Sequence, residues 1–231
     1  MHVIRFVKYK YDPLCLRGNF VGVMMVLSIL ERDFPMNLVR KHPEGVRIFN
    51  SLFCLLGEAG VLFSMYLRFQ KNDLGNLIGD GVLAFALFFA FIYLYKGSGK
   101  RAAIYYKSAL HLFLLSSLIT VVVSFMHRNR TSPSFVVASA VVALIGFILV
   151  ALVAFVPNLG KKRSLYLCGA NYCLREFVFV IVLLLMFFVP SGAYDRSLSV
   201  VIKPFAEAVL SAIIYVNTVY KYIDKENRHT V

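Results

Sequence analysis

The 231-residue sequence has no tryptophan and only 12 acidic residues, and residues of either charge make up just 16% of it. A soluble domain usually has about 25% charged and 45–50% apolar residues, whereas this chain is 59% apolar. Polar side chains are then too few to cover the apolar surface of a protein dissolved in water. The composition excludes a soluble enzyme, a disordered chain and a small disulfide scaffold, and it favours several membrane spans.

Catalytic and metal-binding signatures are also missing. The chain has no GxSxG or HExxH motif, and Gly97-Ser98-Gly99-Lys100-Arg101 lacks the upstream glycine and the Ser/Thr after lysine of a P-loop. None of the four cysteines forms a CxxC pair, and we predict that Cys168 and Cys173 are free thiols in a basic cytoplasmic loop. We therefore expect no catalytic residue, no metal site and no cofactor.

Long apolar runs fill most of the chain beyond residue 47. Six of them are long enough to cross a hydrocarbon core of about 30 Å as helices, which takes about 20 residues. A membrane barrel is excluded because these runs lack the ten-residue alternation of barrel strands. The sequence thus predicts an all-α bundle of six transmembrane helices, arranged as three helical hairpins. The predicted spans are 48–67, 78–95, 108–126, 135–157, 177–194 and 199–222.

Basic residues indicate how these spans are oriented. From the N-terminal segment onward, the successive segments between spans hold 8, 2, 4, 2, 4, 2 and 3 Lys or Arg, which places 19 on one side and 6 on the other. Cytoplasmic loops carry the excess of basic residues, so both termini are predicted to be cytoplasmic. The net charge of +13 then indicates contact with an anionic inner leaflet and not with nucleic acid.

The N-terminal segment is the least regular part of this scheme. Residues 14–30 are apolar, but they number only 17 and include Arg17. An interfacial or re-entrant helix fits this segment better than a seventh span, which remains the alternative. Residues 1–47 are then a basic cytoplasmic or interfacial segment, 48–223 the transmembrane domain and 224–231 a cytoplasmic tail.

Glu58 is the most conspicuous ionisable residue within a predicted span. It lies about ten residues from each end, hence roughly 15 Å deep at about 1.5 Å per residue. A charge there is costly, so the side chain should face protein or a wet cavity. Gly57 and Gly60 beside it would let another helix approach closely. Glu58 is predicted either to handle a proton or cation, or to be a neutral acid in a helix contact.

Glu207 is predicted at nearly the same depth in the last span, about 13 Å from its start at about 1.5 Å per residue. Lys203 lies one turn away on the same helix face, where an ion pair can form. Pro204 between them removes a backbone donor and predicts a kink or interruption. These residues suggest a midplane binding site with a hinge at Pro204, or a simple pairing of Glu207 with a snorkelling Lys203.

His111 completes the set of candidate substrate- or ion-binding residues. It precedes a row of hydroxyl side chains, Ser116, Ser117, Thr120 and Ser124, in the third predicted span. A lone histidine is either a ligand or a hydrogen-bonded helix contact, and hydroxyls in lipid either line a pore or bond their own backbone.

Three functions remain open from the sequence. The first is a transporter or channel, or a subunit of one, that moves a proton, cation or small solute through a midplane site with buried carboxylates. The second is a non-catalytic structural or assembly subunit of a larger membrane complex, and the third is a lipid-modifying enzyme. We expect the chain to form homo- or hetero-oligomers in the plasma membrane, with an internal membrane as the alternative.

Overall fold

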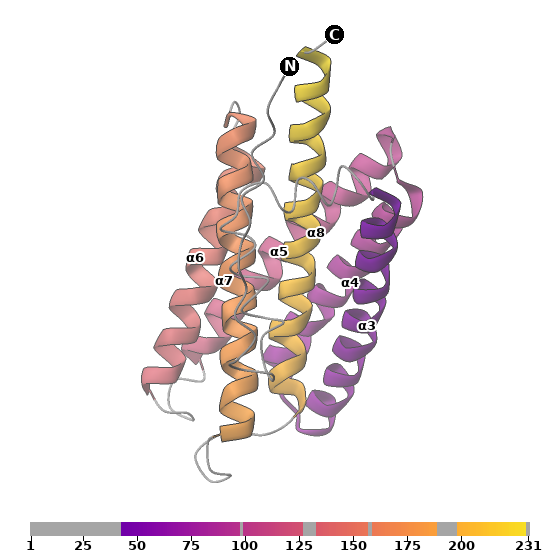
Figure 1. Ribbon diagram of the computed structural model, residues 1–231. Helices are drawn as coiled ribbons and strands as arrows, with labels where there is room; N and C mark the ends of the chain where they lie inside the picture. The colour runs from indigo at the N-terminus through magenta and orange to yellow at the C-terminus, as the bar shows by residue number, and fades with distance from the viewer. Residues whose placement is uncertain (1–42, 98, 127–132, 157–158, 189–197, 230–231) are drawn as a thin grey trace, which may run out of the picture.

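The computed structural model describes residues 43–97, 99–126, 133–156, 159–188 and 198–229, and the described chain is helical throughout, with no strand. The short segment 14–30, and with it the choice between six and seven spans, lies outside these residues. Figure 1 shows the helices running roughly along one common direction. The six helices are α3 (Pro43–Gln70), α4 (Leu74–Lys96), α5 (Lys100–Met126), α6 (Pro133–Phe155), α7 (Lys161–Phe188) and α8 (Leu198–His229).

Five of the helices are long and apolar enough to cross a membrane, which supports a multi-pass membrane protein. The exception is α6, in which the search covered only Ala140–Phe155, although the whole helix has 23 residues. The exact six-span arrangement therefore stays a prediction.

Helix ends follow ordinary local chemistry. Pro43 begins α3, since a proline at the first helical position loses only an N–H that has no helical partner. Asp73 caps α4 by accepting a hydrogen bond from the backbone N–H of Asn76. Gly97 ends α4 with a φ of 72°, a left-handed conformation that suits glycine. Asn72 (φ 53°) turns the chain between α3 and α4 in the same region, which asparagine tolerates.

The long helix α8 lies at the centre of the packing. It contacts α3, α4, α5 and α7, whereas α6 contacts only α5 and α7 among the described residues. In the apolar part of α8, 67% of the residues are buried, whereas the corresponding share is 22–44% in the other four spanning helices. In Figure 1, α8 stands between α7 on one side and α3 and α4 on the other. Any buried side chain of α8 is therefore shielded from lipid by neighbouring helices.

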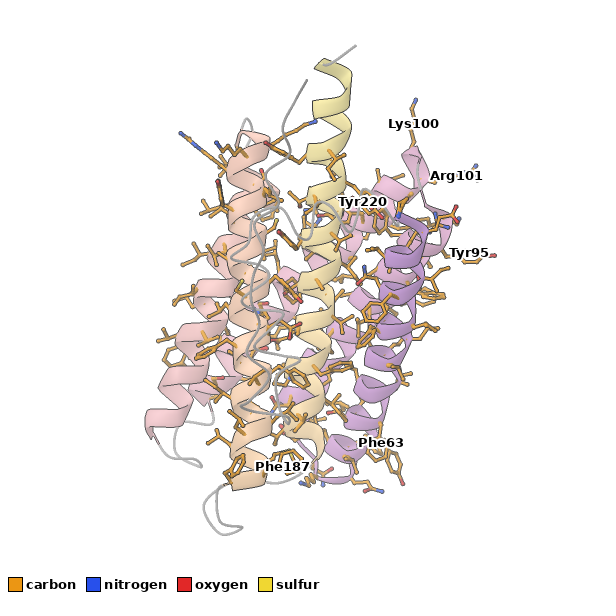
Figure 2. All side chains as sticks on the ribbon, viewed as in Figure 1. Phe63, Tyr95, Lys100, Arg101, Phe187 and Tyr220 are labelled. Atoms are coloured by element: carbon orange, nitrogen blue, oxygen red, sulfur yellow. The ribbon has the colours of Figure 1, made fainter. Side chains whose placement is uncertain are left out.

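The two ends of the bundle can be told apart by their residues. We call the end that holds the start of α3, the α4–α5 turn, the start of α7 and the C-terminal turns of α8 the terminal end (Figure 1). The α3–α4 turn lies at the opposite end. Figure 2 shows Lys100 and Arg101 at the terminal end and Phe63 and Phe187 toward the opposite end.

The start of the fifth predicted span needs correction. The fifth predicted span, 177–194, is helix α7 at Lys161–Phe188, which begins 16 residues earlier. Cys168 and Cys173 therefore lie within a helix and not in a basic loop, and Cys168 is buried. The reason is that Asn171, Tyr172 and Arg175 lower the local hydropathy, although all three side chains are buried against protein.

Small residues set the distance between α3 and α8. Gly57 faces Ala206, whose side chain is fully buried, and a Cβ at Gly57 would lie 3.8 Å from the Ala206 Cα and 3.6 Å from the Leu87 side chain. A methyl group fits this space, but a larger side chain would force the helices apart.

We expect Gly57→Ala to preserve stability and Gly57→Leu to lower it by about 1–3 kcal/mol, the usual cost of overpacking a core. Thermal unfolding of the purified protein in detergent measures this difference. Ala59→Leu, at an exposed position on the same helix, is the matched control and should leave the melting temperature unchanged. Equal effects of Gly57→Leu and Ala59→Leu would contradict the described contact.

Candidate functional site

An ion pair between Arg175 of α7 and Glu207 of α8 lies in the middle of the bundle. The two side chains are only 3% and 8% exposed. Arg175 is about 20 Å from either end of its helix at about 1.5 Å per residue. A lone charge at such depth costs about 2.5–3.5 kcal/mol even on lenient insertion scales, so each residue makes the other tolerable.

Other helices are shaped around the Arg175 guanidinium. Its Nη2 donates a hydrogen bond of 3.1 Å to Ser117 Oγ, and the group lies 5.4 Å from the centre of the Phe113 ring, a cation–π distance. A Cβ at Gly146 would lie 2.7 Å from Nη2, closer than side chains tolerate. Gly146 on α6 is therefore what gives the guanidinium its space.

A second buried ion pair joins α3 and α4. Asp80, which is 1% exposed, accepts hydrogen bonds at its Oδ2 from Arg68 Nε (2.6 Å) and Ser64 Oγ (2.8 Å). Arg68 also bonds Asp73 Oδ2 at 3.2 Å, at the opposite end of the bundle. A charged pair buried with this many hydrogen bonds recovers much of its desolvation cost.

Lys203 of α8 lies near both pairs. Its ammonium interacts electrostatically with both Glu207 and Asp80, and its Nζ lies 3.6 Å from where a Cβ of Gly79 would stand. The resulting row of six charges alternates in sign, and we call it the charge chain. Its members, from the opposite end inward, are Asp73, Arg68, Asp80, Lys203, Glu207 and Arg175.

The charge chain has unused hydrogen-bonding capacity. Asp80 Oδ1 and Glu207 Oε1 are buried and have no hydrogen-bond partner among the described residues, and the same holds for Arg175 Nε. Buried polar atoms almost always find a partner, either in the protein or in water. These carboxylate oxygens could each accept a hydrogen bond from a water molecule or from a polar solute.

A cavity of about 910 Å³ lies at the terminal end of the bundle. We call it the basic cavity, because four cationic side chains line it, namely Arg47, Lys107, Lys161 and Lys221, whereas Glu44 is the one carboxylate of its lining. The rest of its wall is mostly apolar or aromatic, with polar side chains from Asn50, His111, Ser164, Asn217 and Thr218. Its deepest lining residues include Leu110 of α5 and Ile213 of α8.

A buried apolar layer separates the basic cavity from the charge chain. Ile213 is six residues from Glu207, hence about 9 Å along α8 at about 1.5 Å per residue. Phe113, Leu114 and Leu210 occupy the intervening turns and are at most 4% exposed. The charge chain thus reaches this apolar layer from the opposite end of the bundle, and the basic cavity reaches it from the terminal end.

The candidate residues predicted from the sequence are only partly brought together. Lys203 and Glu207 both belong to the charge chain, but the described ion pair of Glu207 is with Arg175. Glu58 lies half-buried on the flank of the α3 face that packs inward, where it interacts with Cys54. No described contact joins Glu58 to Glu207.

Three further candidates have structural or peripheral positions. His111 is exposed, bonds the Lys107 carbonyl through Nδ1 at 2.6 Å and lines the basic cavity. Gly60 packs closely against Ile202, 3.3 Å from its would-be Cβ. Pro204 does not interrupt α8, which is continuous from Leu198 to His229; it only leaves the Val200 carbonyl without its helical donor.

Sequence reasoning missed Arg175, Asp80 and Arg68. The fifth predicted span begins too late to include Arg175, Arg68 lies one residue beyond the first predicted span, and Asp80 lies near the start of the second. The available signal was that Arg68, Asp80 and Arg175 are ionisable residues within or next to apolar runs. A sequence, however, does not show which of these charges form ion pairs.

Metal chemistry has no visible centre here. Across the part of the chain that the structure describes, no three His, Cys, Asp or Glu side chains converge in a way that could hold a metal ion. Comparison of the chain with known protein families, with curated proteins and with solved structures finds no match.

Removing one member of the central ion pair should cost more than removing both. We expect Arg175→Gln to lower the unfolding free energy by about 3–5 kcal/mol, because it leaves the Glu207 carboxylate buried without a countercharge. Adding Glu207→Gln to the same chain should restore part of that loss. Denaturant titration in detergent micelles measures all three proteins, with Glu176→Gln as a control on the neighbouring residue. Additive losses in the double variant would contradict a direct pairing.

Proposed function

We propose that this protein is a small membrane transport protein that moves a polar solute between the basic cavity and the opposite end of the bundle. The observation that carries the proposal is the charge chain. Six charges of alternating sign reach from the opposite end of the bundle to its centre, and two of their carboxylate oxygens have no hydrogen-bond partner within the described part of the chain. Charges inside a membrane domain are expensive, and they usually mark solute or ion pathways.

The apolar layer supports this proposal. An open polar path through the bundle would leak, whereas a transporter closes at least one side of its site at any time. The arrangement resembles a state open toward the terminal end, with Phe113, Leu114 and Leu210 closing the path beneath the basic cavity. In a second state, open toward the opposite end, the ion pair between Asp80 and Arg68 would separate.

The charges of the path favour some solutes over others. The basic cavity has four cations and one carboxylate among its lining side chains, so it attracts anions and repels metal cations. Of the solute classes open from the sequence, a small solute with an acidic group therefore agrees best with this entrance.

The alternative is that the same ion pairs only stabilise the packing of the helices, in a structural subunit of a larger complex. Charges of alternating sign neutralise one another, so they could also stabilise the helix packing of such a subunit. The two functions differ in whether the bundle centre ever becomes accessible to water from both ends.

We expect accessibility from both ends at Ser211, whose fully buried hydroxyl bonds Asn171 Nδ2 and the Glu207 carbonyl. In a background without native cysteines, Ser211→Cys should react with an impermeant thiol reagent added from either side of reconstituted vesicles. Adding Asp80→Asn should speed labelling from the opposite end about tenfold, since losing a charged hydrogen bond worth about 1.5–3 kcal/mol favours the open state.

Two controls accompany this measurement. Glu58→Gln removes a carboxylate from the same half of the bundle but outside the charge chain, so the labelling rate should not change. Ala86→Cys lies in the fully buried core of α4 and should stay unlabelled. Labelling of Ser211→Cys from neither side would favour the structural subunit.

The proposed orientation places the terminal end in the cytoplasm. Arg175, Arg68 and Lys203 belong to the charge chain and leave the loop count, which changes it from 19 against 6 to 18 against 4 basic residues. The remaining bias is stronger, in agreement with the positive-inside rule.

In intact cells, single cysteines at Asn76, Ser132 and Ser197 should react with an impermeant reagent, whereas one at Ser98 should not. The reason is that Asn76 lies in the first turn of α4, and Ser132 and Ser197 between predicted spans, on the side with few basic residues. Permeabilised cells, in which all four should react, provide the control. Labelling of Ser98→Cys in intact cells would reverse the orientation.

A further inference from the structure

The basic cavity combines two kinds of wall. Its cations come from four different helices, with Arg47 on α3, Lys107 on α5, Lys161 on α7 and Lys221 on α8. Side chains that are far apart in the sequence thus surround one space. Like charges gathered in this way repel one another, and an anion between them relieves that repulsion.

Three of these cations are held in place by the protein. Lys221 Nζ lies 4.7 Å above the centre of the Tyr106 ring, and Lys161 Nζ donates a 3.2 Å hydrogen bond to the Lys221 carbonyl. The Arg47 guanidinium packs under Gly97, with Nη1 2.8 Å from where a Cβ would stand. Held charges lose less conformational entropy when they bind a ligand than freely moving ones.

Asn217 adds an independent sign of a ligand. It lines the cavity and is only 6% exposed. Its Oδ1 accepts a 2.6 Å hydrogen bond from the Tyr93 hydroxyl, whereas its buried Nδ2 lies near the Tyr106 hydroxyl but makes no hydrogen bond of ordinary length among the described residues. The amide is thereby oriented with a donor unused, and a ligand oxygen would satisfy it.

Much of the remaining wall is apolar. Leu94, Leu110, Val153, Ile213 and Val216 line the cavity beside the cations. The volume of about 910 Å³ falls within the range of about 300–1,000 Å³ that is usual for organic ligands. A bare inorganic anion would leave most of this space and all of the apolar wall unused.

We propose that the basic cavity binds an amphiphile with a phosphate monoester group. Such a phosphate carries about −1.5 to −2 charges near pH 7 and several strong acceptor oxygens, which suits several cations and the Asn217 donor. Its apolar part would pack on the wall around Leu110 and Ile213. The phosphate belongs either to a lipid headgroup of the phosphatidate type or to a soluble organic phosphate.

This inference names a ligand for the cavity of the proposed transport protein. It rests on the proposed function only in the claim that the bound molecule is then transported. The amphiphile is the ligand of the cavity from which transport would start. Binding can be measured without any flux, so that binding and the two-sided accessibility of Ser211 can fail separately.

The absence of tryptophan makes a direct measurement possible. Tyr220 lines the cavity and is partly exposed, and Figure 2 shows it near the terminal end of α8. In the full chain, Tyr220→Trp creates a single tryptophan fluorophore without background. Reconstituted in phosphatidylcholine vesicles, this variant should be quenched saturably by a small fraction of brominated phosphatidate, and much less by the same fraction of brominated phosphatidylcholine.

Two cavity lysines provide the test of the cause. Lys107→Gln with Lys221→Gln should weaken the apparent affinity for brominated phosphatidate about 30-fold, while Lys107→Arg with Lys221→Arg should keep it. The matched control, Lys100→Gln with Arg101→Gln, removes two charges at the same end outside the cavity lining, where Figure 2 shows Lys100 pointing away from the bundle. That control should retain the affinity.

Phenyl phosphate, a soluble phosphate monoester with an apolar ring, distinguishes the two sources when it is added to lipid vesicles without bromine. If it changes the tryptophan fluorescence of the Tyr220→Trp variant saturably, with the same dependence on the two lysines, while phosphatidate does not quench, the ligand is a soluble organic phosphate and the shared chemistry holds. Equal quenching by both brominated lipids with no response to phenyl phosphate would overturn the proposal. The proposal would also be overturned if the double glutamine variant of Lys107 and Lys221 and the Lys100/Arg101 control lost the same apparent affinity for brominated phosphatidate. This comparison requires that all variants are monodisperse and equally helical.

Discussion

An arginine in the middle of a membrane-embedded helix is the constraint on which the rest of this structure depends. Arg175 is buried about 20 Å from both ends of α7, at about 1.5 Å per residue, so it cannot extend to water at either surface. Its charge must be neutralised by protein, and Glu207 supplies the countercharge. The close packing of α7 on α8, the hydroxyl of Ser117 and the missing side chain at Gly146 all follow from housing this one guanidinium.

The central position of α8 links this pair to the rest of the molecule. Glu207 and Lys203 are one helical turn apart on α8, and Lys203 lies near enough to the Asp80–Arg68 pair of α4 and α3 to interact with it electrostatically. A displacement of α8 along its axis would therefore move Glu207 relative to Arg175 and Lys203 relative to Asp80 at the same time. Since packed interfaces are bistable and not gradually deformable, such a coupling supports two discrete arrangements of the bundle, as the proposed transport requires.

The two polar regions differ in what they can do. The charge chain is narrow and balances its own charges, so it suits a gate that opens when ion pairs separate. The basic cavity is wide, has an excess of positive charge and includes an apolar wall, so it suits the capture of an anionic amphiphile. Between them lie the buried apolar side chains of Phe113, Leu114 and Leu210, which we expect to keep water from joining the two regions.

The sequence by itself determined the class of the protein and the approximate course of its helices. Apolar runs of membrane-spanning length leave no other low-energy structure, because lipid offers no partner for an unpaired backbone group. Span boundaries were least certain where polar residues are buried against protein, as the late start assigned to α7 shows. Hydropathy treats Asn171 and Arg175 as exposed to solvent, although their partners lie 32–40 residues away in the chain.

Only the tertiary structure decided which ionisable residues act together. Glu58 and Glu207 have similar predicted depths, yet depth leaves open the rotation of each helix about its axis. The packing turns Glu207 toward Arg175 and leaves Glu58 half-buried on the flank of α3. The basic cavity likewise depends on cations of four helices that meet only when the helices pack. Helix formation is local and can be predicted from the sequence, whereas these contacts depend on helix rotation and register, which are set by the fit of all the side chains at once.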